Sequence, residues 1–154
     1  MTDHIYTTTL LWSGSTGEGL RAYTRDHRAT APPAAAPVEL SAGPRFRGNG
    51  DRLNPEQLLV MAASSCQLLA FLAVATREHV DVLHYEDAAV GTMSEGEGPM
   101  SIETIRLTPT IRVAAGTDHE LVARLVHEGH EGCFIANSLK TDVTVVATVV
   151  DAQP

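Results

Sequence analysis

Cysteine, lysine and aromatic residues are scarce in this sequence of 154 residues. Its two cysteines are Cys66 and Cys133. Residues 1–12 contain no basic segment followed by an apolar one, so we expect no signal peptide and a cytoplasmic location. Two cysteines in a reducing compartment seldom form a structural cross-link. They are therefore either a reversible redox pair or two inert buried thiols.

Positive charge is also scarce. Lysine and arginine together number 11, aspartate and glutamate number 19, and the formal net charge is −8 at pH 7. This balance argues against nucleic acid or an anionic membrane surface as a partner. The apolar content of 44% and the charged content of 19% are ordinary for a soluble globular protein. The length fits a single domain, residues 1–154, with a core of its own.

Two classes of site lack their sequence signatures. There is no G-x-S-x-G motif, and Ser64 and Ser65 have no evident histidine partner, so a serine hydrolase has little support. His127, His130 and Cys133 form an H-x2-H-x2-C pattern, but no C-x-x-C accompanies it. On one helix only neighbours three or four residues apart face each other, so at most two of these ligands converge. We therefore expect no metal and no cofactor.

The chain does contain one long apolar stretch, residues 54–77, which reads NPEQLLVMAASSCQLLAFLAVATR. Asn54 is suited to cap a helix, and Pro55 suits the first helical position. The apolar residues that follow point in every direction around a helix, which is typical of a buried one. Polar residues in the middle argue against a membrane span. We predict a central core helix that carries the Cys66 thiol.

The other elements follow from apolar alternation and turn residues. We expect a β-hairpin from residues 5–12 and 20–24, a strand at 38–40, a strand at 80–93 with its hairpin partner at 101–113, a helix from 117 with a further turn at 134–139, and a last strand at 141–150. Thr117 and Glu120 fit a capping box. The predicted fold class is α+β, with mostly antiparallel strands in the order β-β-β-α-β-β-α-β. A helix apolar on all sides needs more cover than one small domain offers, so we expect a homodimer.

The cysteines differ in their surroundings. A cysteine in the middle of a helix, such as Cys66, is most often an inert apolar residue. Cys133 stands at the start of a helical turn, a position that lowers the pKa of a thiol. A reactive thiolate needs a nearby cation, for which Arg45, Arg47 and Arg52 just before the helix are candidates, although such residues are mostly solvated. A buried arginine needs a carboxylate, and Glu56 is the nearest.

At this point a family resemblance appears. NPEQLLVMAASSC closely resembles the signature of the OsmC/Ohr family of thiol-dependent hydroperoxide reductases, in which the peroxidatic cysteine follows the glutamate by ten residues, as Cys66 follows Glu56. GCFIANSLKTDVTV resembles the family's segment around a later cysteine, and GPRFRGNGDRLNPE resembles its Arg-Phe-x-Gly lead-in. Gln67 stands where family members commonly have an aromatic residue. The segment from Cys133 also departs from the family's common Cys-Pro-(Val/Tyr)-Ser sequence. These two departures suggest a side branch of the family.

The resemblance implies the family's α+β fold, an intertwined homodimer and a thiol peroxidase, peroxiredoxin-like in its chemistry. In that mechanism Cys66 attacks a hydroperoxide and becomes a sulfenic acid, and Cys133 condenses with it to a disulfide. An external dithiol or lipoyl-type reductant then restores both thiols. Arg45 would be the arginine of the site; in Ohr-type members it comes from the early hairpin, where Arg25 (or Arg21) is the counterpart. Apolar residues would favour organic hydroperoxides over hydrogen peroxide; we expect them to be Met61, Leu69, Phe134 and Ile135.

The sequence leaves two questions open: how Glu56 reaches the site, and whether the protein is an enzyme. Ten residues of helix rise about 15 Å, so Glu56 and Cys66 of one straight helix cannot share a site. Either the helix breaks near residues 60–63, or Glu56 serves the Cys66 of the other subunit. The rival to an enzyme is a non-catalytic dimeric protein of the same fold that binds small molecules and whose cysteines are inert.

Overall fold

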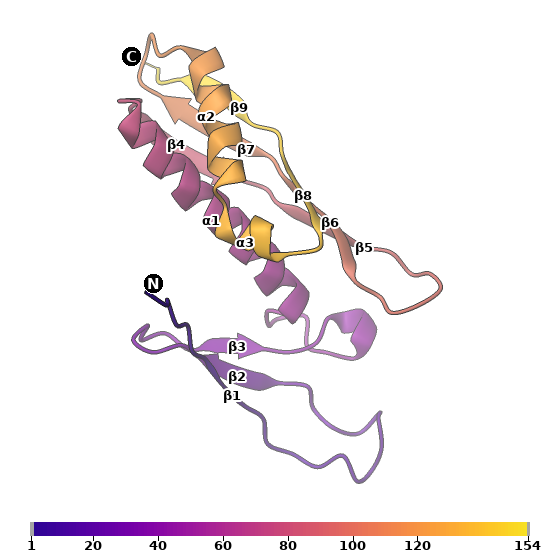
Figure 1. The fold of residues 1–154 in the computed structure, drawn as a ribbon. Helices are drawn as coiled ribbons and strands as arrows, with labels where there is room; N and C mark the ends of the chain where they lie inside the picture. The colour runs from indigo at the N-terminus through magenta and orange to yellow at the C-terminus, as the bar shows by residue number, and fades with distance from the viewer. Residues whose placement is uncertain (1, 154) are drawn as a thin grey trace. The chain divides into compact units, whose positions relative to one another are not determined.

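The computed structural model describes residues 2–153. Contacts along the chain divide it into two compact units, the first ending at Leu58 and the second beginning at Leu59. Figure 1 shows the order of the elements: three strands, a short 3-10 helix, the long helix α1, four strands, the helices α2 and α3, and two strands. The single domain expected from the sequence stays a prediction.

The first unit contains an antiparallel sheet of β1 (Thr9–Leu11), β2 (His27–Thr30) and β3 (Val38–Leu40), followed by the 3-10 helix η1 (Pro44–Phe46). The strand predicted at 38–40 is confirmed, but the returning strand predicted at 20–24 is wrong. Arg25 donates to the carbonyl oxygens of Leu20 and Tyr23, and the Trp12 indole donates to that of Thr24. With these carbonyls bound to side chains, strand pairing starts only at His27.

Helix α1 (Pro55–Arg77) begins where the sequence predicts. Gln57 donates its backbone N–H to the Asn54 side chain, and the Gln57 side chain accepts the Asn54 N–H in return. This reciprocal capping satisfies two of the N–H groups that a helix start leaves without partners. The helix ends just before His79, which has a left-handed backbone (φ 57°). It has no break between residues 60 and 63, so the first of the two alternatives for Glu56 is excluded.

The second unit contains six strands in two three-stranded sheets. One has the order β4 (Val82–Asp87), β7 (Pro109–Val113), β9 (Thr148–Asp151), and the other has the order β5 (Val90–Met93), β6 (Ile102–Leu107), β8 (Asp142–Val145). Each strand predicted at 80–93, 101–113 and 141–150 is therefore two strands, one in each sheet. The break has a physical cause: the Asp87 carboxylate accepts the N–H of Thr108, and Val146 N–H bonds the Leu107 carbonyl across the bend. In Figure 1, β5 follows directly after β4, β7 after β6, and β9 after β8.

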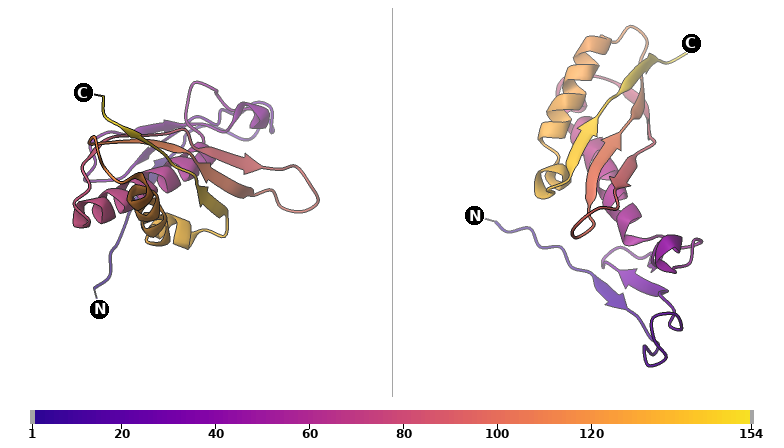
Figure 2. Two further views of the ribbon diagram at one scale, coloured as in Figure 1. Left: turned by 90° about the horizontal axis from the view of Figure 1, so that it is seen from above. Right: turned by 90° about the vertical axis from the view of Figure 1, so that its right-hand side faces the viewer.

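The α+β class is confirmed, but the pairing is more mixed than predicted. β4–β7 and β5–β6 are antiparallel, whereas β6–β8 and β7–β9 are parallel. The parallel pairs need a long crossover, which α2 (His119–Glu131) and α3 (Phe134–Ser138) supply. In Figure 2 the helices of this unit lie on one face of its strands. The core between them is apolar and consists of Ala63, Phe71, Val74, Ala75, Ile105, Leu107, Ile111, Val113, Val122, Leu125, Val126 and Val145.

Helix α1 buries one face within this chain. Its buried residues recur at helical spacing: Ala63, Gln67, Phe71, Val74 and Ala75. Met61 and Leu69, on other faces, are 51% and 64% exposed. By length and composition α1 is also apolar enough to cross a membrane, a criterion that the core helices of soluble proteins meet as well. The stripe packed on α2 and the sheet is that of a core helix.

Helix α2 is capped by Asp118 and not by the predicted Thr117. The Asp118 carboxylate accepts the N–H groups of Glu120 and Leu121 at 2.9 and 3.3 Å, while the Thr117 hydroxyl donates to the Ala114 carbonyl. Threonine and aspartate are both preferred at the N-cap of a helix, so the sequence pattern placed the cap one residue too early.

Replacing Asp118 with alanine should lower the free energy of unfolding by about 1 kcal/mol, because two N–H groups at the start of α2 lose their acceptor. Urea denaturation would measure this. Asp118→Asn is the control, since asparagine caps nearly as well and should keep most of the stability. Equal losses in both variants would contradict the capping role.

Candidate active site

Two free thiols lie side by side in the second unit, Cys66 in the middle of α1 and Cys133 immediately before α3. The first turn of α3 contacts both sulfurs: Ile135 donates its N–H to Cys66 Sγ and Ala136 donates its N–H to Cys133 Sγ, each at 3.5 Å. The Cys66 thiol is close enough to Cys133 to raise the pKa of the Cys133 thiol. The fold thus brings together two cysteines that are far apart in the sequence, a point that their spacing left open.

The thiols differ in exposure. Cys133 is 1% exposed, whereas Cys66 is half-buried. Burial is the largest influence and raises the pKa of the Cys133 thiol, the Ala136 N–H lowers it by less than burial raises it, and the neighbouring Cys66 raises it further. The lowering expected from a helix start is therefore outweighed by desolvation in this five-residue helix.

A cavity of about 590 Å³ opens beside Cys66, between α1 and α2. Its walls are mostly apolar or small and consist of Cys66, Leu69, Ala70, Ala73, Val74, Arg77, Glu128, Gly129, Gly132 and Phe134. Of the pocket residues predicted from the sequence, Leu69 and Phe134 line it. Met61 is exposed elsewhere on α1, and Ile135 is half-buried and holds Cys66 through its N–H. Arg77 and Glu128 form the charged edge of the cavity, with an ion pair at 3.4 Å.

The close approach of α2 to α1 depends on Gly129. A Cβ at this position would lie 2.9 Å from the backbone N and Cα of Phe71, closer than side chains pack. At Gly132, which lines the same cavity, the nearest atoms to an added Cβ would be 3.7 Å away, and the backbone φ of −86° suits any residue.

Gly129→Ala should therefore lower the free energy of unfolding by about 1–3 kcal/mol through overpacking, despite the better helix propensity of alanine. Thermal or urea unfolding would measure the loss. Gly132→Ala is the matched control and should be close to neutral. If Gly129→Ala were as stable as the wild type, the close approach of the helices would not be required.

In the first unit, Arg25 and Glu56 line a second cavity of about 520 Å³. Its other walls are Trp12, Thr16, Tyr23, Thr24, His27, Ser41, Ala42, Gly43, Phe46 and Pro55. The Arg25 guanidinium stacks on the Tyr23 ring at 4.4 Å and donates to the carbonyl oxygens of Leu20 and Tyr23 at 2.7 and 3.0 Å. Among residues 2–153, no ion pair involves Arg25. Its orientation is fixed while its charge is not neutralised by a carboxylate.

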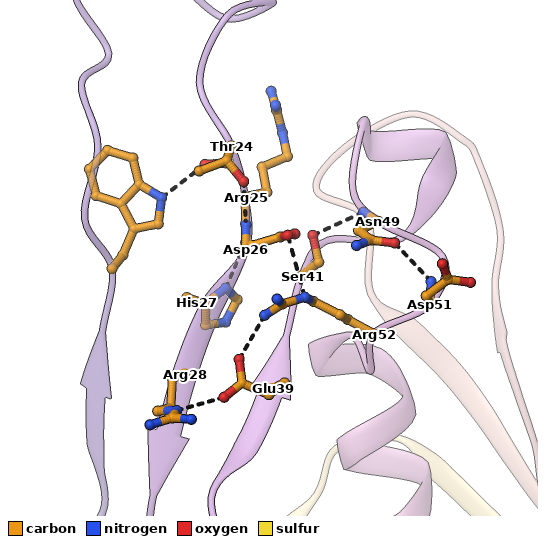
Figure 3. A network of polar contacts seen from close by, with 11 residues as sticks. Thr24, Arg25, Asp26, His27, Arg28, Glu39, Ser41, Asn49, Asp51 and Arg52 are labelled. Carbon is orange, nitrogen blue, oxygen red and sulfur yellow. Dashed lines mark hydrogen bonds and ion pairs between the residues drawn. The ribbon is translucent and has the colours of Figure 1, made fainter.

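The other arginines near α1 are placed differently. Arg52 pairs with Glu39 at 2.7 Å and with Asp26 at 3.3 Å, and Arg28 holds the other Glu39 oxygen at 2.6 Å. The Arg28 hydrogen bond is the main cause that holds the pKa of Glu39 below its ordinary value. Figure 3 shows this network, with the Arg25 side chain pointing away from it. Arg45 lies on η1, is exposed, and does not line the cavity of Arg25 and Glu56.

The H-x2-H-x2-C pattern has other partners in the structure. His130 Nδ1 lies 3.3 Å from the side-chain oxygen of Gln67, and Cys133 accepts the Ala136 N–H. Within residues 2–153 no group of three or more His, Cys, Asp or Glu side chains is arranged to hold a metal ion.

Sequence reasoning missed the role of Gln67. Its side chain is fully buried and bonds α2 at two points, at the Val126 carbonyl and at His130. The sequence did contain a sign of this role. Gln67 follows Cys66 in an apolar helix, and if that helix is buried, the glutamine side-chain amide must find hydrogen-bond partners. The partners themselves could not be named from the sequence.

Comparison with known proteins agrees with this geometry. The family model of OsmC-like proteins matches residues 48–148, which is more than half of the chain. An uncharacterized protein of Acinetobacter baylyi is 28% identical over 130 residues, covering 82% of this chain and 86% of that protein. An OsmC-like protein of unknown function from Vibrio cholerae has a similar structure, with a TM-score of 0.84 and 26% identity over 96% of this chain and 100% of that one.

An organic hydroperoxide resistance protein from Elizabethkingia anophelis shares the fold, with a TM-score of 0.71 and 20% identity over 98% of this chain and 99% of that one. The match of the family model, the shared fold and the pair of adjacent cysteines all lead to the same assignment. The chain belongs to the OsmC-like protein family, which includes the organic hydroperoxide resistance (Ohr) proteins.

Proposed function

We propose that this protein is a thiol-dependent peroxidase that reduces organic hydroperoxides. The Cys66 thiolate attacks the distal oxygen of ROOH, the O–O bond breaks, and ROH leaves after taking up a proton, with Cys66 becoming a sulfenic acid. The Cys133 thiol then attacks that sulfur, releasing water and forming the Cys66–Cys133 disulfide. A dithiol or lipoyl-type reductant supplies two electrons and two protons by exchange and restores both thiols.

The single observation that carries the proposal is the placement of the thiols. Cys66 opens into an apolar cavity, where a hydroperoxide has access, and Cys133 lies buried beside it, where a substrate does not reach. These are the positions that an attacking and a resolving cysteine require. Two inert core cysteines would have no reason to be adjacent, nor would one of them need to face a cavity.

We assign the arginine of the site to Arg25, in preference to Arg45. Arg25 shares its cavity with Glu56, and its guanidinium is oriented by two carbonyls and a tyrosine ring, with no ion-pair partner within residues 2–153. Because α1 is continuous, Glu56 and Cys66 of one chain are separated along it by about 15 Å. Arg25 and Glu56 of one subunit therefore serve Cys66 of a second copy in a homodimer, which also covers the exposed apolar residues of α1.

A peroxidase assay tests the function. Purified protein with dithiothreitol should consume tert-butyl or cumene hydroperoxide faster than hydrogen peroxide, because the walls beside Cys66 are apolar. A protein that consumes neither peroxide, and whose Cys66 does not react with a thiol reagent at neutral pH, would instead be the non-catalytic binding protein. The cytoplasmic location stays part of the proposal and requires localisation of the native protein.

A further inference from the structure

A buried hydrogen-bonded connection joins the two cysteine-bearing segments. Gln67, the residue after Cys66, donates its side-chain Nε2–H to the Val126 carbonyl at 3.1 Å, and its Oε1 lies 3.3 Å from His130 Nδ1. The His130 carbonyl in turn accepts the N–H of Cys133 at 3.1 Å. A residue adjacent to one thiol thus reaches the backbone of the other through a single histidine.

The orientation of these groups follows from their chemistry. A carbonyl oxygen only accepts, so the nitrogen of the Gln67 amide must face Val126 and its oxygen must face His130. His130 Nδ1 therefore carries the hydrogen and donates it. Since Gln67 is fully buried, neither end of its amide has water as a substitute partner. The connection consequently fixes the last turn of α2 against α1.

We propose that Gln67 and His130 are positioning residues for the disulfide step, holding Cys133 next to Cys66 so that the disulfide closes efficiently. The step is Cys66–SOH plus Cys133–SH giving the disulfide and water, and it requires the two sulfurs to approach to bonding distance. The inference deepens the proposed function and rests on it, although disulfide formation itself can be measured without a peroxide.

The test equilibrates the full-length protein with reduced and oxidised glutathione and measures the Cys66–Cys133 disulfide by mass spectrometry. Oxidised glutathione takes two electrons and two protons from the two thiols and becomes two reduced molecules. The equilibrium gives the effective concentration of one thiol at the other. Gln67→Leu and His130→Leu should lower it by roughly tenfold, because the turn before Cys133 is no longer fixed.

Two variants separate positioning from general damage. His130→Asn keeps a donor close to the place of Nδ1 and should remain within about twofold of the wild type. His127→Leu removes an exposed histidine one turn earlier on the same helix and should change nothing. Equal losses in His130→Leu and His130→Asn, or no loss in His130→Leu, would overturn the proposal. If Gln67→Leu fails to fold, the two His130 variants decide by themselves.

A second readout adds cumene hydroperoxide in excess over Cys66, because oxidation of a sulfenic to a sulfinic acid consumes a second molecule of hydroperoxide. With the resolving step slowed, Cys66 should accumulate further-oxidised sulfinic acid in His130→Leu but not in His130→Asn. A wild-type protein that forms the disulfide with glutathione yet consumes no hydroperoxide would refute the proposed function while leaving the positioning role intact. The two failures are therefore distinguishable.

Discussion

Cys66→Ser is expected to reduce hydroperoxide consumption to the rate of the enzyme-free control. A serine hydroxyl stays protonated at neutral pH and does not form the sulfenic acid from which the cycle proceeds. The measurement is consumption of cumene hydroperoxide with dithiothreitol in excess, followed together with the thermal stability of the variant. Serine is close to isosteric with cysteine, so the fold should be retained and the loss should be chemical.

Cys133→Ser is the matched variant and should behave differently. Without a resolving thiol, one equivalent of hydroperoxide should be consumed for each Cys66, after which turnover stalls. Mass spectrometry would identify the sulfenic acid as an adduct with a trapping reagent. Normal steady-state activity in Cys66→Ser would refute the mechanism; normal activity in Cys133→Ser would remove the disulfide from it.

Arg25→Ala should lower kcat/KM for organic hydroperoxides on the order of 10²-fold. A guanidinium near a thiolate stabilises its negative charge, and removing it leaves less thiolate and fewer donors for the peroxide oxygens. Arg45→Ala is the control and should stay within about twofold of the wild type. The reverse outcome would return the role to Arg45, as the family lead-in first indicated.

Mixing two inactive variants tests whether the site spans two subunits. In a heterodimer of Cys66→Ser and Arg25→Ala chains, one site would combine an intact Cys66 with an intact Arg25 from the other chain. With random exchange of subunits in a two-fold dimer, about a quarter of the wild-type activity should return. If no activity returns although mass spectrometry shows heterodimers, the two residues do not act across the dimer.

Local sequence was enough for elements whose structure depends on near neighbours. The start of α1 at Asn54 and Pro55 follows from capping and from the fixed φ of proline, and α3 follows from the residues after Cys133. The predicted strands were located correctly for the most part, but their breaks were not. The break near Thr108 depends on the Asp87 carboxylate, 21 residues away, which no local pattern reveals.

The candidate site shows the same division. The sequence by itself determined which residues are available: two cysteines, a glutamate in the first turn of a long helix, and arginines before it. Only the tertiary structure decided that Cys133 lies beside Cys66, that Gln67 bonds His130, and that Arg25 shares a cavity with Glu56. The physical reason is that periodicity and capping act within a few residues, whereas a site is formed by packing between segments distant in the chain. Sequence alone gives no measure of those distances.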